Sequence, residues 1–356
     1  MDILKQLPPS PAGKIGFPWT KETPPQYSVE NLPKISIITP SFNQGKFIEE
    51  TIRSVLLQGY PNLEYIIIDG GSTDETLEII KKYSDFITYW VSKPDEGQSH
   101  AINEGLAKAT GDIFNWINSD DLLAPNALWK IASCFLGNTN IDVLIGKLKV
   151  IKHDELLVDS YRMQYFEDVE STMNFGGMSQ PSLFFRLEKI KLLIGVDERF
   201  HYCMDLDLWY RYLLTFGLKH IASTEQTLAY YRVHDATKSS NEKEANAERL
   251  VLILTLLRAL GMSEQNINKL KPQTLDLKKY NKVWDLNAPF LNKNKLYAYL
   301  LEQILVSPHF DFSLFTSFKL WIISFKFYSK GRRQYFFTLP LRAIYRKFKK
   351  YRKAYK

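Results

Sequence analysis

Through the first third of the chain, short runs of apolar residues typical of strands alternate with segments in which apolar residues recur at the spacing of a helix. Short apolar-rich runs, bounded by polar or turn-forming residues, predict strands at 34–39, 63–68, 88–91 and 112–117. Between these runs, helices are predicted over 47–57, 77–83 and 98–109. Because strands and helices alternate in this order, the pattern predicts an α/β fold in which helices cover both faces of a parallel sheet.

The residues before the second predicted helix form a capping-box pattern. Ser72 stands three residues before Glu75 in the run Ser-Thr-Asp-Glu. In a capping box the first hydroxyl accepts a hydrogen bond from the fourth backbone N–H, and the fourth side chain reaches back. We therefore expect this box to open the helix over 77–83.

Polar residues follow three of the predicted strands, at 39–43, 69–72 and 118–121. In an open parallel sheet, ligands bind beyond the carboxyl ends of the strands, so these residues should face one site. Neither G-x-G-x-x-G nor a P-loop motif follows the first strand. The sequence therefore disfavours dinucleotide and P-loop sites.

Two of these polar segments each allow two interpretations. Asp69, followed by Gly70 and Gly71, is either part of a tight strand-to-helix turn or a contact to a base or ribose that the backbone approaches closely. Asp120 and Asp121 repel each other unless something compensates their charge. They form either a solvated loop that caps the next helix or a site for Mg²⁺ or Mn²⁺, which oxygen ligands suit.

Two segments carry a resemblance to a known family: ITPSFNQGKFIEETIRSVLLQGYPNLEYIIIDGGSTDET and KPDEGQSHAINEGLAKATGDIFNWINSDD. They resemble family 2 of the inverting glycosyltransferases, over about residues 34–236. The resemblance implies a GT-A fold, a Rossmann-like, mixed and mostly parallel sheet that binds a nucleotide-diphospho-sugar. It also implies that the donor contacts Thr39, Pro40, Phe42, Asn43, Asp69, Gln98, Asn118, Ser119 and Asp120.

The resemblance further implies a divalent cation, Mg²⁺ or Mn²⁺, as cofactor. Asp120 takes the place of the ligand that bridges the cation to the diphosphate. Asn118 stands where many members carry aspartate, so one charge is missing and a weaker metal site is expected. His234, in the motif YYRVHDATKS, either ligates the metal, touches the diphosphate or is structural. His100 also stands where relatives often carry aspartate, and its role is left open.

The stretch YCMDLDLWYRYLL resembles the family motif that supplies the general base. Asp205 takes the place of the base that deprotonates the acceptor hydroxyl as it attacks the anomeric carbon. Arg211 follows at the spacing of the motif, whereas Met204 replaces its usual acidic first residue. The residues alone favour a different interpretation, in which Asp205 is a helix N-cap and Asp207 a first-turn acid.

Residues 176–186, with the sequence GGMSQPSLFFR, occupy the place where the family shapes its acceptor side. Gln180, Pro181 and Ser182 are therefore candidate acceptor contacts. The alternative, which the apolar Leu-Phe-Phe favours, is that these residues begin a buried strand.

Positive charge is concentrated at the end of the chain. Residues 312–356 contain thirteen Lys and Arg residues and no Asp or Glu, and subtracting them from the total charge of +7 leaves −6 for residues 1–311. Aromatic residues interleave with these cations, as in segments that lie at an anionic membrane surface. The alternatives are a helical subdomain that packs on the rest and a nucleic-acid patch. The acidic body argues against nucleic acid.

Cysteine use and hydropathy bear on the compartment. Cys134 and Cys203 are far apart in the sequence, which disfavours a disulfide framework or a zinc site and fits a reducing compartment. We see no signal peptide and no apolar stretch near ~20 residues. The expectation is a cytoplasmic protein, peripheral on the inner face of the cell membrane. We expect four segments: an irregular lead-in at 1–33, a GT-A catalytic domain at 34–240, a helical bridge at 241–310 and a basic amphipathic tail at 311–356.

Together these observations predict a metal-dependent inverting glycosyltransferase. It would move a sugar from a nucleotide-sugar, with UDP favoured, to a hydroxyl of a lipid-linked saccharide during synthesis of a surface polysaccharide such as an O-antigen. The alternative is a non-catalytic nucleotide-sugar-binding or scaffold protein at the membrane. Asn118 and Met204 keep that alternative open.

Overall fold

The computed structural model describes residues 3–24, 31–152, 155–175, 178–235, 237–238, 241–272 and 275–306. The chain forms two compact units, which are described separately. The first comprises Met1–Met163, Gly177–Leu208 and Lys219–Ser240, and the second comprises Gln164–Gly176, Trp209–Leu218 and Asn241–Lys356.

A nine-stranded sheet runs through the first unit, in the order β3-β2-β1-β4-β8-β6-β9-β5, with β7 beside β6. The first four strands are parallel to one another and are β1 (Ile35–Ser41), β2 (Leu63–Asp69), β3 (Tyr89–Ser92) and β4 (Ile113–Trp116). The others are β5 (Leu122–Leu123), β6 (Val143–Lys152), β7 (Glu155–Arg162), β8 (Leu183–Arg186) and β9 (Ile221–Arg232). Since β8 is antiparallel to β4 and β6, while β6 is parallel to β9, the sheet is mixed.

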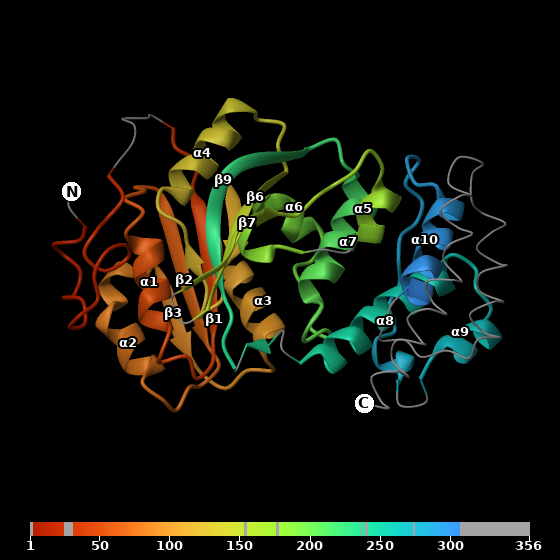
Figure 1. Cartoon of the computed structure of the whole chain (residues 1–356), viewed down its shortest axis with the longest axis horizontal. Coiled ribbons are helices and arrows are strands. Elements are labelled where there is room, and N and C mark those ends of the chain that lie inside the picture. Colours follow the sequence, from red (N-terminus) through yellow and green to blue (C-terminus); the bar gives the residue numbers. More distant parts are fainter. Residues whose placement is uncertain are drawn as a thin grey trace, which may run out of the picture. The chain divides into compact units, whose positions relative to one another are not determined.

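Helices cover both faces of the parallel strands (Figure 1). On one face lie α1 (Ile48–Leu56) and α2 (Thr76–Lys82), whose residues Ile52 and Ile80 share a buried cluster with Ile37 of β1. On the other face lies α3 (Gln98–Lys108), where a Cβ added at Gly105 would meet Ile38 of β1 at 2.6 Å. Alternate residues of β1 therefore serve opposite faces. The unit also contains α4 (Ala127–Gly137) and α6 (Leu187–Leu192).

The predicted strands and helices of the first third are confirmed, with two corrections. The first concerns the end of β1: the sequence predicts that the strand stops at residue 39, before Pro40, but it continues through Pro40 to Ser41. Pairing with β4 stops at Ile38↔Trp116, whereas pairing with β2 continues to Ser41↔Asp69. Proline lacks an N–H, and here no β4 partner stands opposite to require it.

The second correction concerns the capping box, which is absent. Helix α2 has Glu75 at its N-cap with no side-chain cap bond, and Ser72 instead donates its hydroxyl hydrogen to Asp69 at 2.5 Å. The Thr76 N–H is satisfied by Asp74, whose Oδ1 accepts it at 3.0 Å. The hydroxyl of Ser72 is used by the turn after β2 rather than by the helix.

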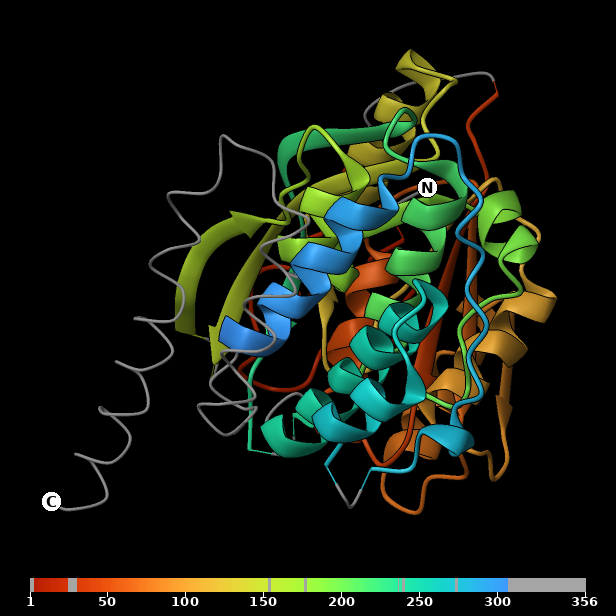
Figure 2. The ribbon, with the colours of Figure 1, turned by 90° about the vertical axis from the view of Figure 1, so that its right-hand side faces the viewer.

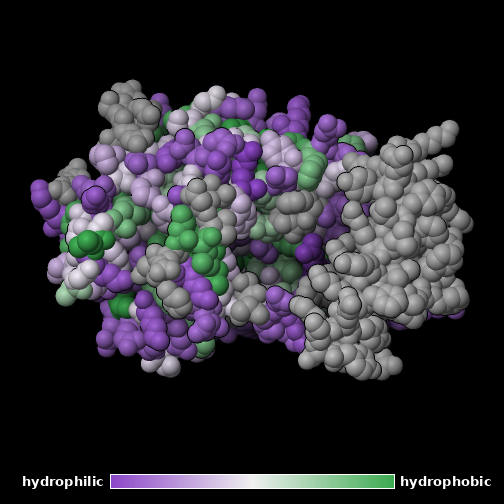
Figure 3. All heavy atoms as spheres, viewed as in Figure 1, coloured by the Kyte–Doolittle hydropathy of each residue, from purple (hydrophilic) through white to green (hydrophobic). Residues whose placement is uncertain are grey.

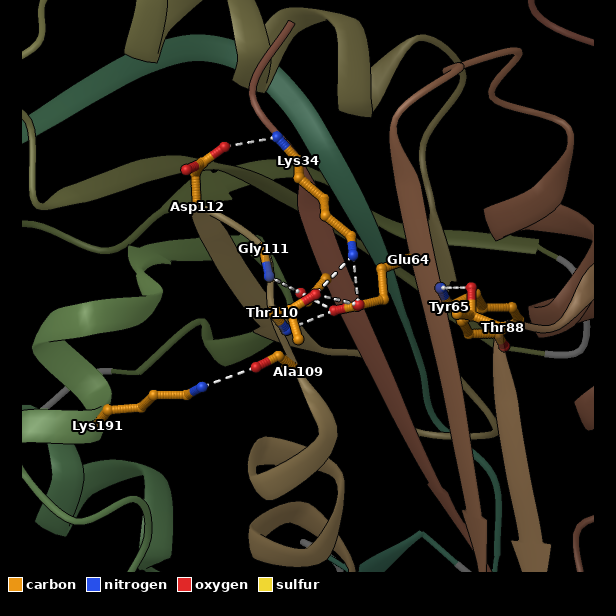
Figure 4. Close-up of polar contacts among 10 residues, drawn as sticks. Lys34, Glu64, Tyr65, Thr88, Ala109, Thr110, Gly111, Asp112 and Lys191 are labelled. Atoms are coloured by element: carbon orange, nitrogen blue, oxygen red, sulfur yellow. Dashed lines mark hydrogen bonds and ion pairs between the residues drawn. The ribbon is translucent and has the colours of Figure 1, made fainter.

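A buried carboxylate joins the amino ends of β1, β2 and β4 (Figure 4). Glu64 accepts hydrogen bonds from the Ser36 hydroxyl at 2.5 Å, from the Thr110 backbone at 2.7 Å and from the Thr110 hydroxyl at 2.6 Å. The Lys34 ammonium lies 2.6 Å from it. Burial alone would raise the pKa of Glu64, but these donors more than offset it and lower the pKa to about 2.

The second unit is helical. Its elements are α5 (Val169–Phe175), the later part of α7 (Met204–Phe216), α8 (Glu242–Ala259), α9 (Glu264–Leu270) and α10 (Lys293–Val306). Helix α10 packs against α5 and α8 (Figure 2). Lys295 of α10 pairs with Asp168, and the Tyr210 hydroxyl donates to the Met173 carbonyl at 3.0 Å. Apolar burial along 250–257 and these polar contacts hold the unit together.

The predicted basic tail at 311–356 lies outside the described residues. Within the part of the chain that the structure describes, no helix is long and apolar enough to span a membrane. On the face shown in Figure 3, polar residues dominate and apolar ones appear in small groups. Leu156 and Leu157 of β7 are among the exposed apolar side chains.

Candidate functional site

The carboxyl ends of the parallel strands lie at one edge of the sheet. In the register of the strands, Ser41 of β1 pairs with Asp69 of β2, which pairs with Ser92 of β3. On the other side of β1, Ile38 pairs with Trp116, so the chain leaves β4 at the same edge and enters 118–121. The polar segments predicted to share a site are thus brought to one edge.

Asp69 organises the turn that follows β2. Its side chain is fully buried, and its carboxylate accepts from the Ser72 backbone at 2.9 Å, the Ser72 hydroxyl at 2.5 Å and the Ser92 hydroxyl at 2.6 Å. The Gly71 N–H also donates to it, at 3.2 Å. The tight-turn interpretation is therefore confirmed, and a direct contact of Asp69 with a nucleoside stays a prediction.

The tip of β1 divides into buried and exposed residues. Thr39 is fully buried, with its hydroxyl 3.1 Å from that of Tyr65, and Pro40 is buried beside it. Phe42 is 59% exposed. Asn43 adopts a left-handed conformation with φ 52°, and its side-chain oxygen accepts from the Thr73 N–H at 2.9 Å. Among these four predicted donor contacts, Phe42 and Asn43 present exposed surface.

Asn118 lies at the centre of a row of side-chain hydrogen bonds across the site. Its Oδ1 accepts from Gln98 Nε2 at 2.7 Å, and its Nδ2 donates to Asp121 Oδ2 at 3.1 Å. Gln98 in turn accepts from the Lys238 ammonium at 3.0 Å. Two predicted donor residues, Gln98 and Asn118, are therefore in direct contact, and both polar atoms of the Asn118 amide are occupied.

Asp121 is fully buried, and its side chain bonds to other residues of the site. Its Oδ1 accepts from the Arg232 N–H at 3.0 Å, and its Oδ2 is the partner of Asn118. Burial, reinforced by the negative charge of Asp120, raises the pKa of Asp121 well above its usual range. The Asp121 side chain thus connects the end of β4 to the end of β9.

Asp120 meets His234, which lies 114 residues further along the chain. Asp120 Oδ2 and His234 Nε2 are 3.0 Å apart, with side chains only 18% and 12% exposed. Ser119, whose side chain is buried, contributes a carbonyl that accepts from the Thr51 hydroxyl at 3.0 Å. The predicted metal residues Asp120 and His234 are brought together.

Asp205 lies in the first turn of α7, and its Oδ1 accepts from the Leu206 N–H at 2.7 Å. The preceding loop is tied to α3, because the Ser99 hydroxyl donates to the Phe200 carbonyl at 2.7 Å. Lys238, the partner of Gln98, also lies over the ring of Tyr202, at 5.4 Å. These contacts bring the segment before Asp205 to the Gln98 side of the site. Since α7 begins at Met204, Asp205 is a helical residue and not the N-cap.

Gln180, Pro181 and Ser182 are buried in a short 3-10 turn that leads directly into β8. Gln180 Nε2 donates to Asn115 Oδ1 at 2.9 Å and to the Trp116 carbonyl at 2.7 Å, while Asn115 donates to the Pro181 carbonyl at 3.0 Å. The interpretation as the beginning of a buried strand is confirmed. These side chains join β8 to β4 just before the 118–121 segment.

His100 belongs to a separate group of side chains. Its Nδ1 lies 3.4 Å from Glu198 Oε2, and one ligand atom from each of Glu96, His100 and Glu198 falls within 4.8 Å of the other two. Glu198 also accepts from Asn103 at 2.7 Å. His100 is therefore oriented toward Glu198 in the loop before α7.

The sequence alone did not single out Arg232 and Glu50. Arg232 is buried, with Nη2 2.9 Å from Glu50 Oε2 and Nε donating to the Asp120 carbonyl at 3.1 Å. Arg232 stands in the YYRVH motif, which was the available signal. Glu50 is 182 residues away, and no local pattern connects the two.

The Asp120–His234 pair fits a divalent cation. The observed 3.0 Å is the length of an ordinary hydrogen bond between the two side chains. It is also close to the ~3 Å between two ligands that lie about 2.1 Å from a metal at right angles to one another, so a cation could replace the hydrogen bond without a large movement. Both atoms are good ligands for Mn²⁺, and the carboxylate suits Mg²⁺. Asn118 adds no charge to this pair.

Comparison with known proteins agrees with this architecture. Residues 36–191 match Glycosyl transferase family 2. An uncharacterized glycosyltransferase of Rickettsia typhi is 29% identical over 244 residues, covering 65% of this chain and 74% of the relative. One of Rickettsia prowazekii is 30% identical over 216 residues, covering 57% of this chain and 65% of the relative.

A solved structure shares the fold. The crystal structure of S. aureus TarS 1-349 in complex with UDP-GlcNAc has a TM-score of 0.52 and 17% sequence identity, covering 88% of this chain and 89% of that one. The predicted GT-A architecture of the first unit is confirmed. Residues 36–191 therefore form a domain of Glycosyl transferase family 2, and the chain is similar to glycosyltransferases over 65% of its length.

Proposed function

We propose that this glycosyltransferase transfers a sugar with inversion from a nucleotide-sugar to a hydroxyl group of a saccharide, in a reaction that depends on a divalent cation. The observation that carries the proposal is the pairing of Asp120 with His234, 3.0 Å apart at the carboxyl edge of the parallel strands. Ligands of open α/β sheets bind at that edge.

The exposure and hydrogen bonds of the predicted residues suggest which part of the nucleotide-sugar each one would contact. Phe42, which is 59% exposed, offers an aromatic surface for a base at the end of β1. Asp69 and Asn43 keep the neighbouring turn in shape, through their bonds to Ser72 and Thr73. Gln98 and Asn118 present amides that exchange their mutual hydrogen bond for ribose hydroxyls.

Asp120 and His234 are the residues that would hold Mg²⁺ or Mn²⁺. The bound cation would supply positive charge to the diphosphate, which stabilises it as a leaving group. Thr51 and Arg232 fix the backbone of this segment, since they donate to the carbonyls of Ser119 and Asp120.

Asp205 is the proposed general base. Its carboxylate would take the proton from the acceptor hydroxyl as that oxygen attacks the anomeric carbon from the side opposite the diphosphate. Attack from the opposite side inverts the configuration at that carbon. The position of Asp205 in the first turn of α7, next to a loop tied to Ser99, supports this role.

The donor and acceptor are proposed from the relatives and the tail. TarS 1-349 was crystallised with UDP-GlcNAc, which supports a UDP-sugar as the first donor to try. The thirteen cations of residues 312–356 favour attachment to an anionic membrane, and a membrane-attached transferase suits a lipid-linked saccharide acceptor. Synthesis of a surface polysaccharide such as an O-antigen, on the cytoplasmic membrane face, would use such an acceptor.

A specific observation favours a second candidate, a nucleotide-sugar-binding protein without catalysis. Both polar atoms of the Asn118 amide are engaged, by Gln98 and Asp121, at the position where a second acidic metal residue is common in the family. Such a protein would bind nucleotide with the metal held by Asp120 and His234, and would not release it from a donor.

The experiment that tests the metal role is a calorimetric titration of UDP with and without Mn²⁺. Asp120→Ala should remove the metal-dependent part of the affinity, while the control Asp85→Ala, at an exposed 3-10 turn of the same unit, should not. If Asp120→Ala binds UDP as wild type does in both conditions, the proposed metal role is wrong.

A further inference from the structure

The first turns of α1 face the polar ends of two strands. Phe47 is the N-cap of α1, and Glu50 and Thr51 follow it by three and four residues in the first turn, a spacing that brings the three to the same side. The Thr51 hydroxyl is within hydrogen-bonding distance of the carbonyls of Ser119, at 3.0 Å, and Asp121, at 2.8 Å. Thr51 of α1 therefore contacts the backbone carbonyls of the two residues that flank Asp120.

Glu50 acts on Asp120 through Arg232. The Arg232 guanidinium donates to Glu50 at 2.9 Å and to the Asp120 carbonyl at 3.1 Å, and its central carbon lies 5.4 Å from the centre of the Phe47 ring. A planar guanidinium with two directed hydrogen bonds and an aromatic neighbour has little freedom to turn. Since Arg232 is buried, its charge also needs Glu50 as a partner.

Phe47 acts on His234 directly. The two rings stack with their centres 4.4 Å apart and an angle of 29° between their planes. At the edge of the imidazole, Nε2 lies 3.0 Å from Asp120 Oδ2, and the backbone of His234 is held by the Thr237 hydroxyl at 2.7 Å. The face of the imidazole is thus fixed by Phe47 and its edge by Asp120.

We infer that Phe47 and Glu50 are positioning residues for the cation site. Phe47 fixes the plane of the His234 imidazole, and Glu50 fixes the position of the Asp120 backbone through Arg232. The two ligand atoms, Asp120 Oδ2 and His234 Nε2, are thereby held at the separation that a bound cation would require. The inference rests on the proposed function, because it assigns these residues to the Asp120–His234 pair.

Such supporting contacts affect metal affinity more than stability. Residues that orient metal ligands typically contribute about 10–100-fold to metal affinity. Phe47→Leu keeps an apolar side chain but removes the stacked ring, and Glu50→Gln keeps a hydrogen-bond acceptor for Arg232 but removes the charge. We expect each variant to weaken Mn²⁺ binding about 10–100-fold in the presence of UDP. Phe47→Tyr keeps the ring and should bind Mn²⁺ within about threefold of wild type.

The experiment is a Mn²⁺ titration of the full chain at saturating UDP, followed by electron paramagnetic resonance of free Mn²⁺, with the melting temperature measured in parallel. Glu49→Gln is the matched control, because Glu49 is next to Glu50 on α1 but accepts from Lys82 and Tyr83, each at 2.7 Å. It should leave the Mn²⁺ affinity unchanged.

The outcomes separate the inference from the function on which it rests. Weak Mn²⁺ binding by Phe47→Leu and Glu50→Gln, with Phe47→Tyr and Glu49→Gln like wild type, supports the inference. Wild-type affinity in both Phe47→Leu and Glu50→Gln, while Asp120→Ala loses binding, overturns the inference alone. If wild type itself binds no Mn²⁺ with UDP, the proposed metal dependence fails as well. Should Phe47→Leu not fold, Glu50→Gln decides.

Discussion

Replacing Glu64 with glutamine removes the negative charge from the network that joins the amino ends of β1, β2 and β4 (Figure 4). The carboxylate is 5% exposed and has donors from Lys34, Ser36 and Thr110. The amide of the variant would offer one acceptor oxygen in place of two and would point an N–H₂ group at groups that are themselves donors. We therefore expect a large loss of stability at neutral pH.

The magnitude follows from the lowered pKa of Glu64. A carboxyl group whose pKa falls from its ordinary value of 4.5 to about 2 on folding contributes about 3 kcal/mol when ionised. Because the pKa is lower in the folded protein, this stability is fully present above pH 4.5 and is lost as the pH falls toward 2. The part of the Glu64→Gln loss that comes from ionisation should be about 3 kcal/mol at about pH 7 and less than half as much at about pH 3.

The assay is hydrogen exchange of the backbone amides of β1, β2 and β4, read by mass spectrometry at about pH 7 and, under urea, at about pH 3. This readout is local to the first unit, so unfolding of the helical unit does not obscure it. Glu225→Gln is the control, because Glu225 pairs with Lys147 at 2.7 Å but is 68% exposed. An exposed pair contributes little, so its protection should hardly change.

Two results would refute this reasoning. A loss for Glu64→Gln that is the same at neutral and at acidic pH would mean that ionisation of Glu64 does not stabilise the fold. An equal loss for Glu225→Gln would mean that burial does not distinguish the two carboxylates.

Two further predictions concern packing and the tail. Gly105→Ala places a Cβ 2.6 Å from Ile38, so the overpacking cost of about 1–3 kcal/mol should exceed the ~1 kcal/mol gained by replacing glycine in a helix, and the melting temperature should fall. The Cβ of Gly137→Ala meets nothing within 4 Å, so this variant should keep or raise the melting temperature. Equal melting temperatures for the two variants would contradict the close contact of α3 with β1. Truncation after Pro308 removes the thirteen tail cations, each worth ~1 kcal/mol near an anionic leaflet, and should abolish sedimentation with anionic liposomes. Unchanged sedimentation would show that the tail is not the anchor.

The parts of the fold that the sequence predicted are those in which a local pattern decides the structure. The apolar runs of β1, β2 and β4 and the helical spacing of α1 and α3 could be recognised because each element buries its own apolar residues in the core. The parallel arrangement then places Asp69 and Asn118 at one edge without further information.

The remainder depended on contacts between distant residues. Ser72 reads as a helix cap locally, but Asp69 and Asn43 engage it in the folded chain. The same reason hid the path from Glu50 through Arg232 to Asp120, which spans 182 positions of the sequence. A motif could suggest His234 as a ligand, but only the fold brings Phe47 onto its ring.

The most direct test of the central claim is a nucleotide-release screen. Purified full-length protein would be incubated with UDP-, GDP- and dTDP-sugars, with Mn²⁺ or Mg²⁺ and with or without a membrane lipid extract, beside Asp205→Asn. We predict metal-dependent release of nucleotide from one donor, strongest with the extract and lost in Asp205→Asn. Equal release by Asp205→Asn, or no release from any donor while UDP still binds, would contradict catalysis by Asp205 at this site.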